Sequence, residues 1–427
     1  MKERALFLYA HGYPDEQGLS TADRRAFACL RALACLAEVD LLCLIPCRAA
    51  GYPAPAGLGP LCRSITAIPA PPTRLAGVWR AAAAALTSNP IGVALKRSPE
   101  ARRRLRDMIA RNAYALVYAY SPLSLACCLS DLGQRNGPPL LVEVVEVLYA
   151  ALRSYTAEPA RAIGLGMAIQ ARQWPLMRKF ERTVYARADR VICLSREEAE
   201  LVQALGADIQ TTVLPLAVDC SVFRPAGDAD GGKEPCMLFT GNFLHPPNVL
   251  AAVELCGKIL PAVRTRFPAA RMLFVGKGAA TALGPLAGES VELHDSVPDL
   301  LPFYHRAAVV AGPVRTGCGV RGKFLEALAA GCPVVTTPLG ASGIEVDRSD
   351  GLIAEESAEG MAAAIADLLS DPAARAGLSR RCASAVRVRH SHEEHQRLMT
   401  ALLAPFLYGK GRDGPASAVP AGTAGVL

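Results

Sequence analysis

The chain has 427 residues, of which 51% are hydrophobic and 20% charged. This composition excludes a disordered or fibrous protein, and the length predicts two or three domains. Aromatic residues make up only 6%, whereas glycines number 36 and prolines 32, so we expect an α/β fold with a core of small aliphatic side chains. The net charge of +7 is uneven, because residues 1–215 carry 26 basic against 18 acidic residues and the rest carry 20 against 21.

Neither a membrane-spanning segment nor a leader is indicated. No apolar run reaches the ~18 residues of a spanning helix, and the segment from Met1 to Gly12 is too short and wrongly flanked for a signal peptide. The 14 cysteines are scattered, without the spacing of a zinc site or of a disulfide framework. We therefore expect a cytoplasmic protein with reduced cysteines and no bound metal.

Short apolar runs alternate with helical patterns in the first half of the chain. The runs predict buried strands at Arg4–Leu8, Val39–Ile45, Ala115–Tyr120, Leu140–Val147, Arg190–Leu194 and Thr211–Val218. Helical spacing lies between them at Arg24–Leu36, Arg102–Asn112, Gln170–Ala188 and Arg196–Leu205. This alternation predicts a mostly parallel sheet with helices on both faces, so residues 1–218 form one doubly wound domain.

The alternation stops at residues 219–235, where glycine and proline predict a linker. It resumes with strands at Cys236–Thr240, Met272–Val275, Val291–Leu293, Ala307–Val310 and Pro333–Thr336, and with helices at Asn248–Thr265, Val320–Ala330, Ser357–Ser370, Pro372–Arg387 and His392–Tyr408. We expect a second doubly wound domain over 236–390, a helix over 391–409 that returns to the first domain, and a disordered tail over 410–427. Ligands of such sheets bind at the carboxyl ends of the strands.

Two glycine turns follow strands of the second domain. Gly241 and Asn242 come after the first strand, before Pro246-Pro247-Asn248 opens a helix, and Gly276 and Lys277 come after the second. A glycine turn in front of a helix offers backbone N–H groups and a positive dipole end to a phosphate. A structural tight turn has the same sequence, so both interpretations stay open.

The most informative segment is RTGCGVRGKFLEA, residues 315–327, which leads from a strand into a helix. Arg321 and Lys323 fall in the predicted first helical turn, where their charges oppose the helix dipole. A bound diphosphate would remove this conflict. Glu326 lies one turn further on, where a carboxylate can accept both hydroxyls of a ribose; an exposed helix residue is the alternative.

This segment, followed by GCPVV and TPLG and preceded by Pro246-Pro247-Asn248, resembles the donor-binding domain of retaining GT-B glycosyltransferases of the glycogen-synthase-like family 4. It looks most like the bacterial subgroup associated with exopolysaccharide and exosortase loci. Val191–Pro215 and Arg24–Ile45 resemble parts of that family's first domain. The resemblance implies two Rossmann-like domains that face a cleft, and transfer of a sugar from a nucleotide-diphosphate sugar to an acceptor hydroxyl with retention, without a metal or other cofactor.

The resemblance also implies roles for individual residues. Arg321 and Lys323 would hold the donor diphosphate, and Glu326 the ribose. The other expected donor contacts are Gly241, Asn242, Gly276, Lys277, Ser296, Val297, Arg315, Thr316, Gly317, Cys318, Gly319 and Val320. Two features depart from the family's pattern: Cys318 stands in the place of the first of two glutamates, and Asn242 and His245 replace an arginine and a lysine.

On the acceptor side the resemblance points to the loop after the first strand, with His11 and Gly18, and to Glu146. Glu143 and Glu146 lie three apart on a predicted strand, so they face opposite sides and at most one points into the cleft. Pairing with nearby arginines is the alternative for both glutamates.

The basic excess of the first half is densest in one predicted helix. It holds four closely spaced arginines: Arg102, Arg103, Arg104 and Arg106. They form either a solvated face or a surface that attracts an anionic membrane or acceptor, in which case the protein would lie peripherally at the inner face of the plasma membrane. We expect a glycan, lipid-linked or small-molecule acceptor and no nucleic acid, because no recognition module accompanies the arginines. A GT-B sugar-nucleotide epimerase and an inactive nucleotide-sugar-binding protein remain as alternatives.

Overall fold

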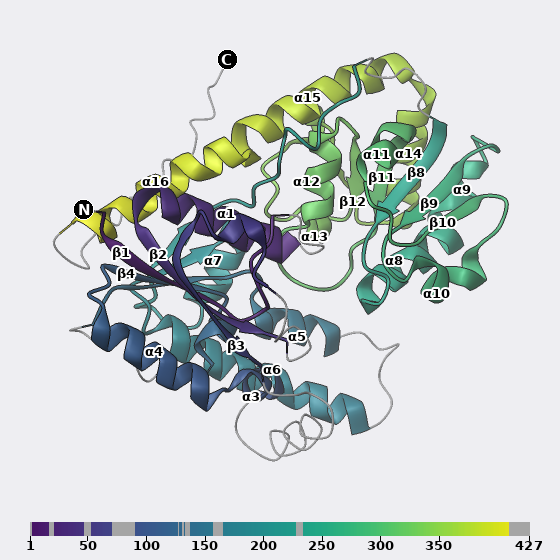
Figure 1. The fold of residues 1–427 in the computed structure, drawn as a ribbon. Helices are drawn as coiled ribbons and strands as arrows, with labels where there is room; N and C mark the ends of the chain where they lie inside the picture. The colour runs from purple at the N-terminus through teal and green to yellow at the C-terminus, as the bar shows by residue number, and fades with distance from the viewer. Residues whose placement is uncertain are drawn as a thin grey trace. The chain divides into compact units, whose positions relative to one another are not determined.

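The computed structural model describes residues 2–16, 21–46, 53–70, 90–126, 128–129, 132, 137–156, 165–227 and 234–409. The chain divides into two compact units. Unit 1 comprises Met1–Leu214 and His395–Leu427, and unit 2 comprises Pro215–Glu394. Each unit has its own parallel sheet, with seven strands in unit 1 and six in unit 2 (Figure 1). The expected pair of Rossmann-like α/β folds is confirmed.

The sheet of unit 1 has the strand order β3-β2-β1-β4-β5-β6-β7. Its strands are β1 (Arg4–Tyr9), β2 (Glu38–Ile45), β3 (Cys62–Pro69), β4 (Leu116–Tyr120), β5 (Leu140–Glu143), β6 (Arg190–Cys193) and β7 (Thr211–Val213). The helices of this part of the chain are α1 (Thr21–Leu36), α3 (Ile91–Lys96), α4 (Pro99–Arg111), α5 (Leu148–Thr156), α6 (Leu165–Tyr185), α7 (Arg196–Gln203) and α16 (His392–Tyr408). The chain reverses its winding between β1 and β4, which is the switch point of a doubly wound sheet.

The sheet of unit 2 has the strand order β10-β9-β8-β11-β12-β13 and its switch point between β8 and β11. Its strands are β8 (Glu234–Thr240), β9 (Arg271–Val275), β10 (Val291–His294), β11 (Ala307–Gly312), β12 (Val334–Thr336) and β13 (Leu352–Ala354). Its helices are α8 (Pro246–Glu254), the π-helix η6 (Leu255–Ile259), α9 (Leu260–Arg264), α10 (Ala279–Leu283), α11 (Leu301–Arg306), α12 (Gly322–Ala329), α13 (Pro338–Ala341), α14 (Ala358–Ser370) and α15 (Pro372–His390).

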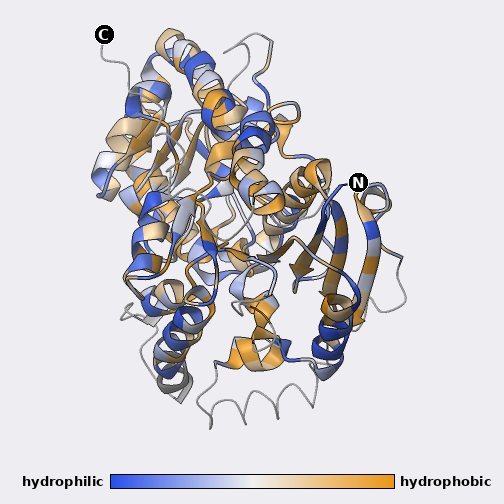
Figure 2. Cartoon of the chain, turned by 90° about the vertical axis from the view of Figure 1, so that its left-hand side faces the viewer, coloured by the Kyte–Doolittle hydropathy of each residue, from blue (hydrophilic) through white to orange (hydrophobic). Residues whose placement is uncertain are grey.

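The central strands are apolar along their whole length because helices cover both faces of each sheet. Every residue of β4 and of β11 is buried. Figure 2 shows the strands as mainly hydrophobic and most helices with mixed faces. Helix α16 adds Leu398, Met399 and Leu403 to the core of unit 1. None of the helices in the described part of the chain is both long and apolar enough to cross a bilayer, and the cysteines described there are free thiols, most of them buried.

Some differences from the predicted elements lie at sheet edges and strand ends, and the helices α3, α5, α10, α11 and α13 were not predicted. Strand β3 was not predicted, because this edge strand exposes Arg63 and Ser64 and lacks a continuous apolar run. Strand β5 ends at Glu143 instead of continuing to Val147, so Glu146 lies beyond the strand. The prediction that Glu143 and Glu146 occupy opposite faces of one strand is therefore wrong.

Candidate functional site

The loops that follow β8, β9 and β10 are bound to one another at the carboxyl edge of the unit 2 sheet. The Gly241 N–H donates to the carbonyl of Val275 (3.0 Å), and the Gly276 N–H donates to that of His294 (2.9 Å). Gly276 has a φ of +138°, and a Cβ there would lie 2.1 Å from the carbonyl oxygen of Gly241. The two predicted glycines are thus in contact, and position 276 accepts only glycine.

Lys323 reaches these loops from the first turn of α12. Its Nζ donates to Asn248 Oδ1 (2.9 Å) and lies 4.0 Å from the centre of the Phe239 ring. A Cβ on Gly241 would lie 3.2 Å from the same nitrogen. Burial, followed by the charge of Arg321, lowers the pKa of Lys323 to about 7, against the opposing effect of Glu326. An anion bound at this edge would favour the charged form of the lysine.

Arg321 precedes α12 as its N-cap residue, not within the first turn as predicted. Its guanidinium donates to the carbonyls of Cys318 (2.6 Å) and Gly319 (2.9 Å) through Nη1, and to that of Thr316 (3.3 Å) through Nη2. Gly317 and Gly319 have φ values of +100° and +89°, which glycine adopts without strain. The arginine therefore holds the glycine loop in place.

Glu326 lies on the buried side of α12, with 6% of its surface exposed. This excludes the alternative of an exposed helix residue. The hydroxyl of Tyr304 donates to Glu326 Oε2 (3.3 Å), and burial, followed by the charge of Glu326, raises the pKa of that hydroxyl. The structure thus holds a buried carboxylate one turn after Lys323.

Arg315 does not join Lys323 in this structure. Its guanidinium pairs with Glu254 of α8 (2.8 Å) and with Glu356 (2.9 Å). The hydrogen bond to Glu254 is the main reason why the pKa of Arg315 is raised. Two carboxylates therefore balance the charge of this arginine. Through these two ion pairs, Arg315 connects α8 with the loop before α14.

The remaining predicted donor contacts lie on the turns around these loops. Ser296 has a φ of +51°, and its hydroxyl donates to Asp295 Oδ1 (3.1 Å). The same oxygen accepts the N–H of Gly278 (2.8 Å), the N-cap residue of α10. The Lys277 carbonyl accepts the N–H of Phe243 (2.8 Å). The side chains of Val297 and Val320 pack, partly buried, against the core, and Asn242 Oδ1 accepts the N–H of Leu244 (3.1 Å).

In unit 1, His11 follows β1, and its ring centre lies 5.7 Å from that of Tyr9. Partial desolvation of the imidazole, followed by the charge of Lys96, lowers the pKa of His11 to about 4. The residue as a whole is nevertheless exposed. Gly18 lies outside the described residues.

The two glutamates of unit 1 have different surroundings. Glu143 is fully buried, forms an ion pair with Arg25 and accepts the hydroxyl of Tyr118, so the arginine-pairing alternative holds for it. Glu146 is partly buried before α5. Burial is the main reason why the pKa of Glu181 is raised to about 7, and the charge of Glu146 adds to this effect.

Helix α4 carries the predicted arginine cluster. It begins after Ser98, whose side chain accepts the N–H of Ala101, and it buries Ala101 and Leu105. The opposite face exposes Arg103, Arg104 and Arg106. The helix is thus amphipathic, with a basic outer face.

Asn248 is the site residue whose contact the sequence analysis did not anticipate. Only its place in the PPN motif had been noted, because its partner lies 75 positions along the chain. One signal was available, namely the absence of any lysine or arginine between Gly241 and Asn248. Among the described residues, no group of three His, Cys, Asp or Glu side chains could hold a metal ion.

Two domain families of known proteins together match most of the chain. Residues 17–217 match the Glycosyl transferase 4-like domain, and residues 234–371 match Glycosyl transferases group 1. The chain belongs to the GT4-type GT-B glycosyltransferases. The chain is similar to a curated protein, the phosphatidyl-myo-inositol mannosyltransferase of Mycolicibacterium smegmatis, with 31% identity over 195 residues. That match covers 43% of this chain and about half, 49%, of the relative.

Solved glycosyltransferase structures share the fold. Sucrose-phosphate synthase from Thermosynechococcus elongatus superposes with a TM-score of 0.70 at 19% identity, over 96% of this chain and 100% of that one. Anabaena HepE, solved in complex with UDP and glucose, gives a TM-score of 0.61 at 13% identity, over 94% of this chain and 99% of that one. Because the sequence identities are low, these structural similarities establish only that the fold is shared.

Proposed function

We propose that this glycosyltransferase moves a sugar from a nucleoside-diphosphate sugar to an acceptor hydroxyl, with retention at the anomeric carbon. The observation that carries the proposal is the position of Lys323, whose Nζ is held 2.9 Å from a neutral amide beside the glycine loops. A preorganised cation stabilises the charge that develops on a departing diphosphate. The HepE structures with UDP and with UDP-glucose support a nucleotide-sugar donor.

In the proposed reaction the bond from the anomeric carbon to the diphosphate breaks, and a bond to the acceptor oxygen forms on the same face of the sugar. In the resembled family the leaving phosphate takes the acceptor proton, so the chain has to supply position and charge. Lys323 supplies the charge, and Arg321 holds the glycine loop that would lie against the sugar. Because these groups and the helix N-termini carry the electrostatic work, we expect no metal requirement, and EDTA should leave turnover unchanged.

Glu326 is the proposed ribose contact, because it is a buried carboxylate one helical turn from Lys323. Glu326→Gln should weaken binding of the free nucleoside diphosphate, since the amide still accepts but lacks the charge that strengthens such bonds. A variant that binds the free nucleotide normally and fails only with the sugar donor would instead place Glu326 against the sugar.

The donor is identified by a thermal-shift screen of UDP, GDP, ADP and TDP sugars. A ligand present at 100 times its dissociation constant adds ~2.7 kcal/mol to the free energy of unfolding, which a melting curve resolves. Release of the nucleoside diphosphate together with a new glycosidic bond supports the transferase. Binding without donor turnover would favour an inactive binding protein, and an isomerised donor without a new bond would favour an epimerase.

The acceptor side of the proposal rests on α4. Its exposed arginines, Arg103, Arg104 and Arg106, would dock the protein peripherally on the anionic cytoplasmic face of a membrane to reach a lipid-linked acceptor. Each basic residue near such a surface contributes ~1 kcal/mol, and the attraction decays over ~8 Å at physiological salt.

Vesicle co-sedimentation tests this docking. We expect the protein to sediment with anionic but not with neutral vesicles, and salt or the joint neutralisation of the four α4 arginines should weaken the association. A protein that ignores anionic vesicles at low salt would point to a glycan or small-molecule acceptor in solution.

A further inference from the structure

The loop after β8 contains His245 but no lysine or arginine as far as Asn248. In addition, the first two residues of α8, Pro246 and Pro247, have no backbone N–H to offer an anion. The positive charge at this loop comes from Lys323, which lies on α12. A contact between α8 and α12 therefore decides where that charge is held.

Asn248 makes this contact through its Oδ1, while its Nδ2 binds the loop after β8. Its Oδ1 accepts the Lys323 ammonium (2.9 Å), and its Nδ2 donates to the carbonyl of Asn242 (2.8 Å). An ammonium only donates and a carbonyl only accepts, so the two partners fix the orientation of the amide. The carboxamide also fills the space above Gly241, where a Cβ would lie 3.1 Å from it.

We propose that Asn248 is a positioning residue, which aims the Lys323 ammonium at the donor diphosphate while leaving its charge intact. This inference rests on the proposed function. An ammonium has three donors, so the bond to Asn248 leaves two for phosphate oxygens. A carboxylate at position 248 would hold the lysine equally well, but it would cancel the charge and repel the diphosphate.

The groups that face Lys323 come from four elements. Arg321 and Glu326 are its charged neighbours at and within α12. The Phe239 ring of β8 lies 4.0 Å from its nitrogen, and Tyr304 of α11 donates to its carbonyl (3.3 Å). Asn248 supplies the neutral acceptor. Since burial makes the charged lysine costly, the loss of this acceptor should favour the neutral amine.

The first arm of the experiment needs no ligand. Lys323 is titrated by the pH dependence of its acetylation with acetic anhydride, read by mass spectrometry, in the wild type and in the Asn248→Asp and Asn248→Leu variants. We expect Asn248→Asp to raise the pKa of Lys323 by roughly one unit or more, as an adjacent opposite charge does, and Asn248→Leu to lower it. Lys258 serves as the internal control, because it is exposed on η6, the π-helix that continues from α8.

Leu250→Asp is the matched control variant, because it adds a carboxylate to the exposed side of α8. It should leave the titration of Lys323 unchanged. Melting curves and circular dichroism establish that each variant is folded, and Asn248→Asp, being isosteric, keeps the test informative if Asn248→Leu unfolds.

The second arm measures UDP binding between pH 6 and 9. We expect both Asn248 variants to bind UDP at least tenfold more weakly than the wild type at pH 8. The pH above which the UDP affinity declines should be higher in Asn248→Asp and lower in Asn248→Leu than in the wild type. A folded Asn248→Asp protein with the wild-type titration of Lys323 and wild-type UDP affinity would overturn the positioning role alone. A wild type that binds no nucleoside diphosphate would overturn the proposed function and, with it, the role of Asn248 toward a diphosphate.

Discussion

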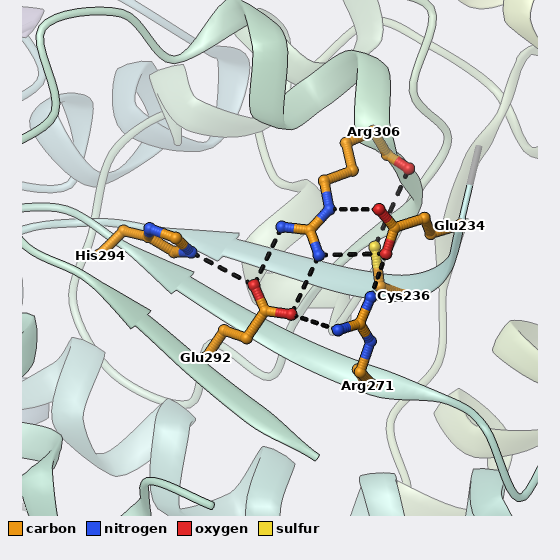
Figure 3. Close-up of polar contacts among 6 residues, drawn as sticks. All are labelled: Glu234, Cys236, Arg271, Glu292, His294 and Arg306. Atoms are coloured by element: carbon orange, nitrogen blue, oxygen red, sulfur yellow. Dashed lines mark hydrogen bonds and ion pairs between the residues drawn. The ribbon is translucent and has the colours of Figure 1, made fainter. Parts of the chain in front are cut away.

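The two ends of the unit 2 sheet treat charge in opposite ways. At the amino edge, Arg306 binds Glu234 (2.7 Å) and Glu292 (2.9 Å), and Arg271 binds both of the same carboxylates (Figure 3). At the carboxyl edge, the Lys323 ammonium is bonded to an amide. The first arrangement pairs each charge with an opposite one, whereas the second places Lys323 against a neutral acceptor, where the proposed diphosphate would supply the opposite charge.

The two edges also differ in which parts of the sheet their contacts join. The four charged residues of the amino edge lie on β8, β9, β10 and the end of α11, so their ion pairs hold neighbouring strands in register. His294 extends this network, with its imidazole 3.4 Å from Glu292 and its ring against Phe303. The loops of the carboxyl edge are joined mainly by backbone hydrogen bonds, and we propose this edge as the donor site.

Gly276→Ala should have the largest effect of these substitutions, because it disrupts the packing of the loops at the carboxyl edge. A Cβ would lie 2.1 Å from the Gly241 oxygen at a φ of +138°. Backbone strain of this kind costs ~1–3 kcal/mol, and the overlap adds to it, so urea denaturation should show a loss of roughly 2–4 kcal/mol together with lost UDP binding. Gly257→Ala is the control, since its Cβ would meet nothing within 4 Å and should be neutral or slightly stabilising. Equal stability of the two variants would contradict the packing described for the loops.

Lys323→Ala removes the charge and keeps the loops. A charge-assisted bond to phosphate is worth ~1.5–3 kcal/mol, so the dissociation constant of UDP should rise roughly 10- to 150-fold. The melting temperature should change little, because burial already disfavours the charged lysine. Lys258→Ala, on the exposed surface of η6, is the control. Unchanged UDP binding in Lys323→Ala would remove this residue from the donor site.

Arg306→Ala should affect stability alone, because it acts at the amino edge. The side chains of the network are 26–37% exposed, so we expect a loss of only about 1 kcal/mol and an unchanged UDP affinity. Arg266→Ala, which breaks the more exposed pair with Asp367, should cost less. A loss of UDP binding in Arg306→Ala would show that the two edges are coupled.

The same network predicts a pH dependence. Hydrogen bonds from Arg306 are the main cause that lowers the pKa of Glu234 and of Glu292. A carboxyl group whose pKa is lower in the folded state stabilises it above the unfolded value of about 4.3, and this stabilisation is lost as the pH falls through the folded value. The free-energy difference between wild type and Arg306→Ala should therefore be larger at pH 7 than at pH 3.5.

The sequence was sufficient to predict the fold because continuous apolar runs mark buried parallel strands. It was insufficient at β3, where the exposed Arg63 and Ser64 interrupt the run, and at β13, which buries only Leu352 and Ile353. The helix over His392–Tyr408 was predicted with its observed limits, because its apolar spacing is regular.

The candidate site was predicted as a set of residue types but not as a set of contacts. The glycines at 241 and 276 follow predictable strands, so their place at the sheet edge could be inferred. The partners of Arg315, which are Glu254 and Glu356, lie far away in the chain, and so does the Asn248 partner of Lys323. Such pairings depend on how loops from different strands meet, which local sequence does not encode.

The central claim is that the carboxyl edge holds a cation for a diphosphate, and the pH dependence of UDP binding tests it most directly. In the free protein the pKa of Lys323 is about 7, and a bound diphosphate would raise it. Between these two values the complex holds a proton that the free protein lacks, so affinity falls as the pH rises, by at most tenfold per unit.

Isothermal titration calorimetry of UDP between pH 7 and 9, in buffers of different ionisation enthalpy, measures both quantities. We predict weaker binding at higher pH and net proton uptake at pH 8, both of which disappear in Lys323→Ala. Affinity that is constant from pH 7 to 9 without proton uptake, or a protein that binds neither UDP nor GDP, ADP or TDP at any pH, would contradict the account.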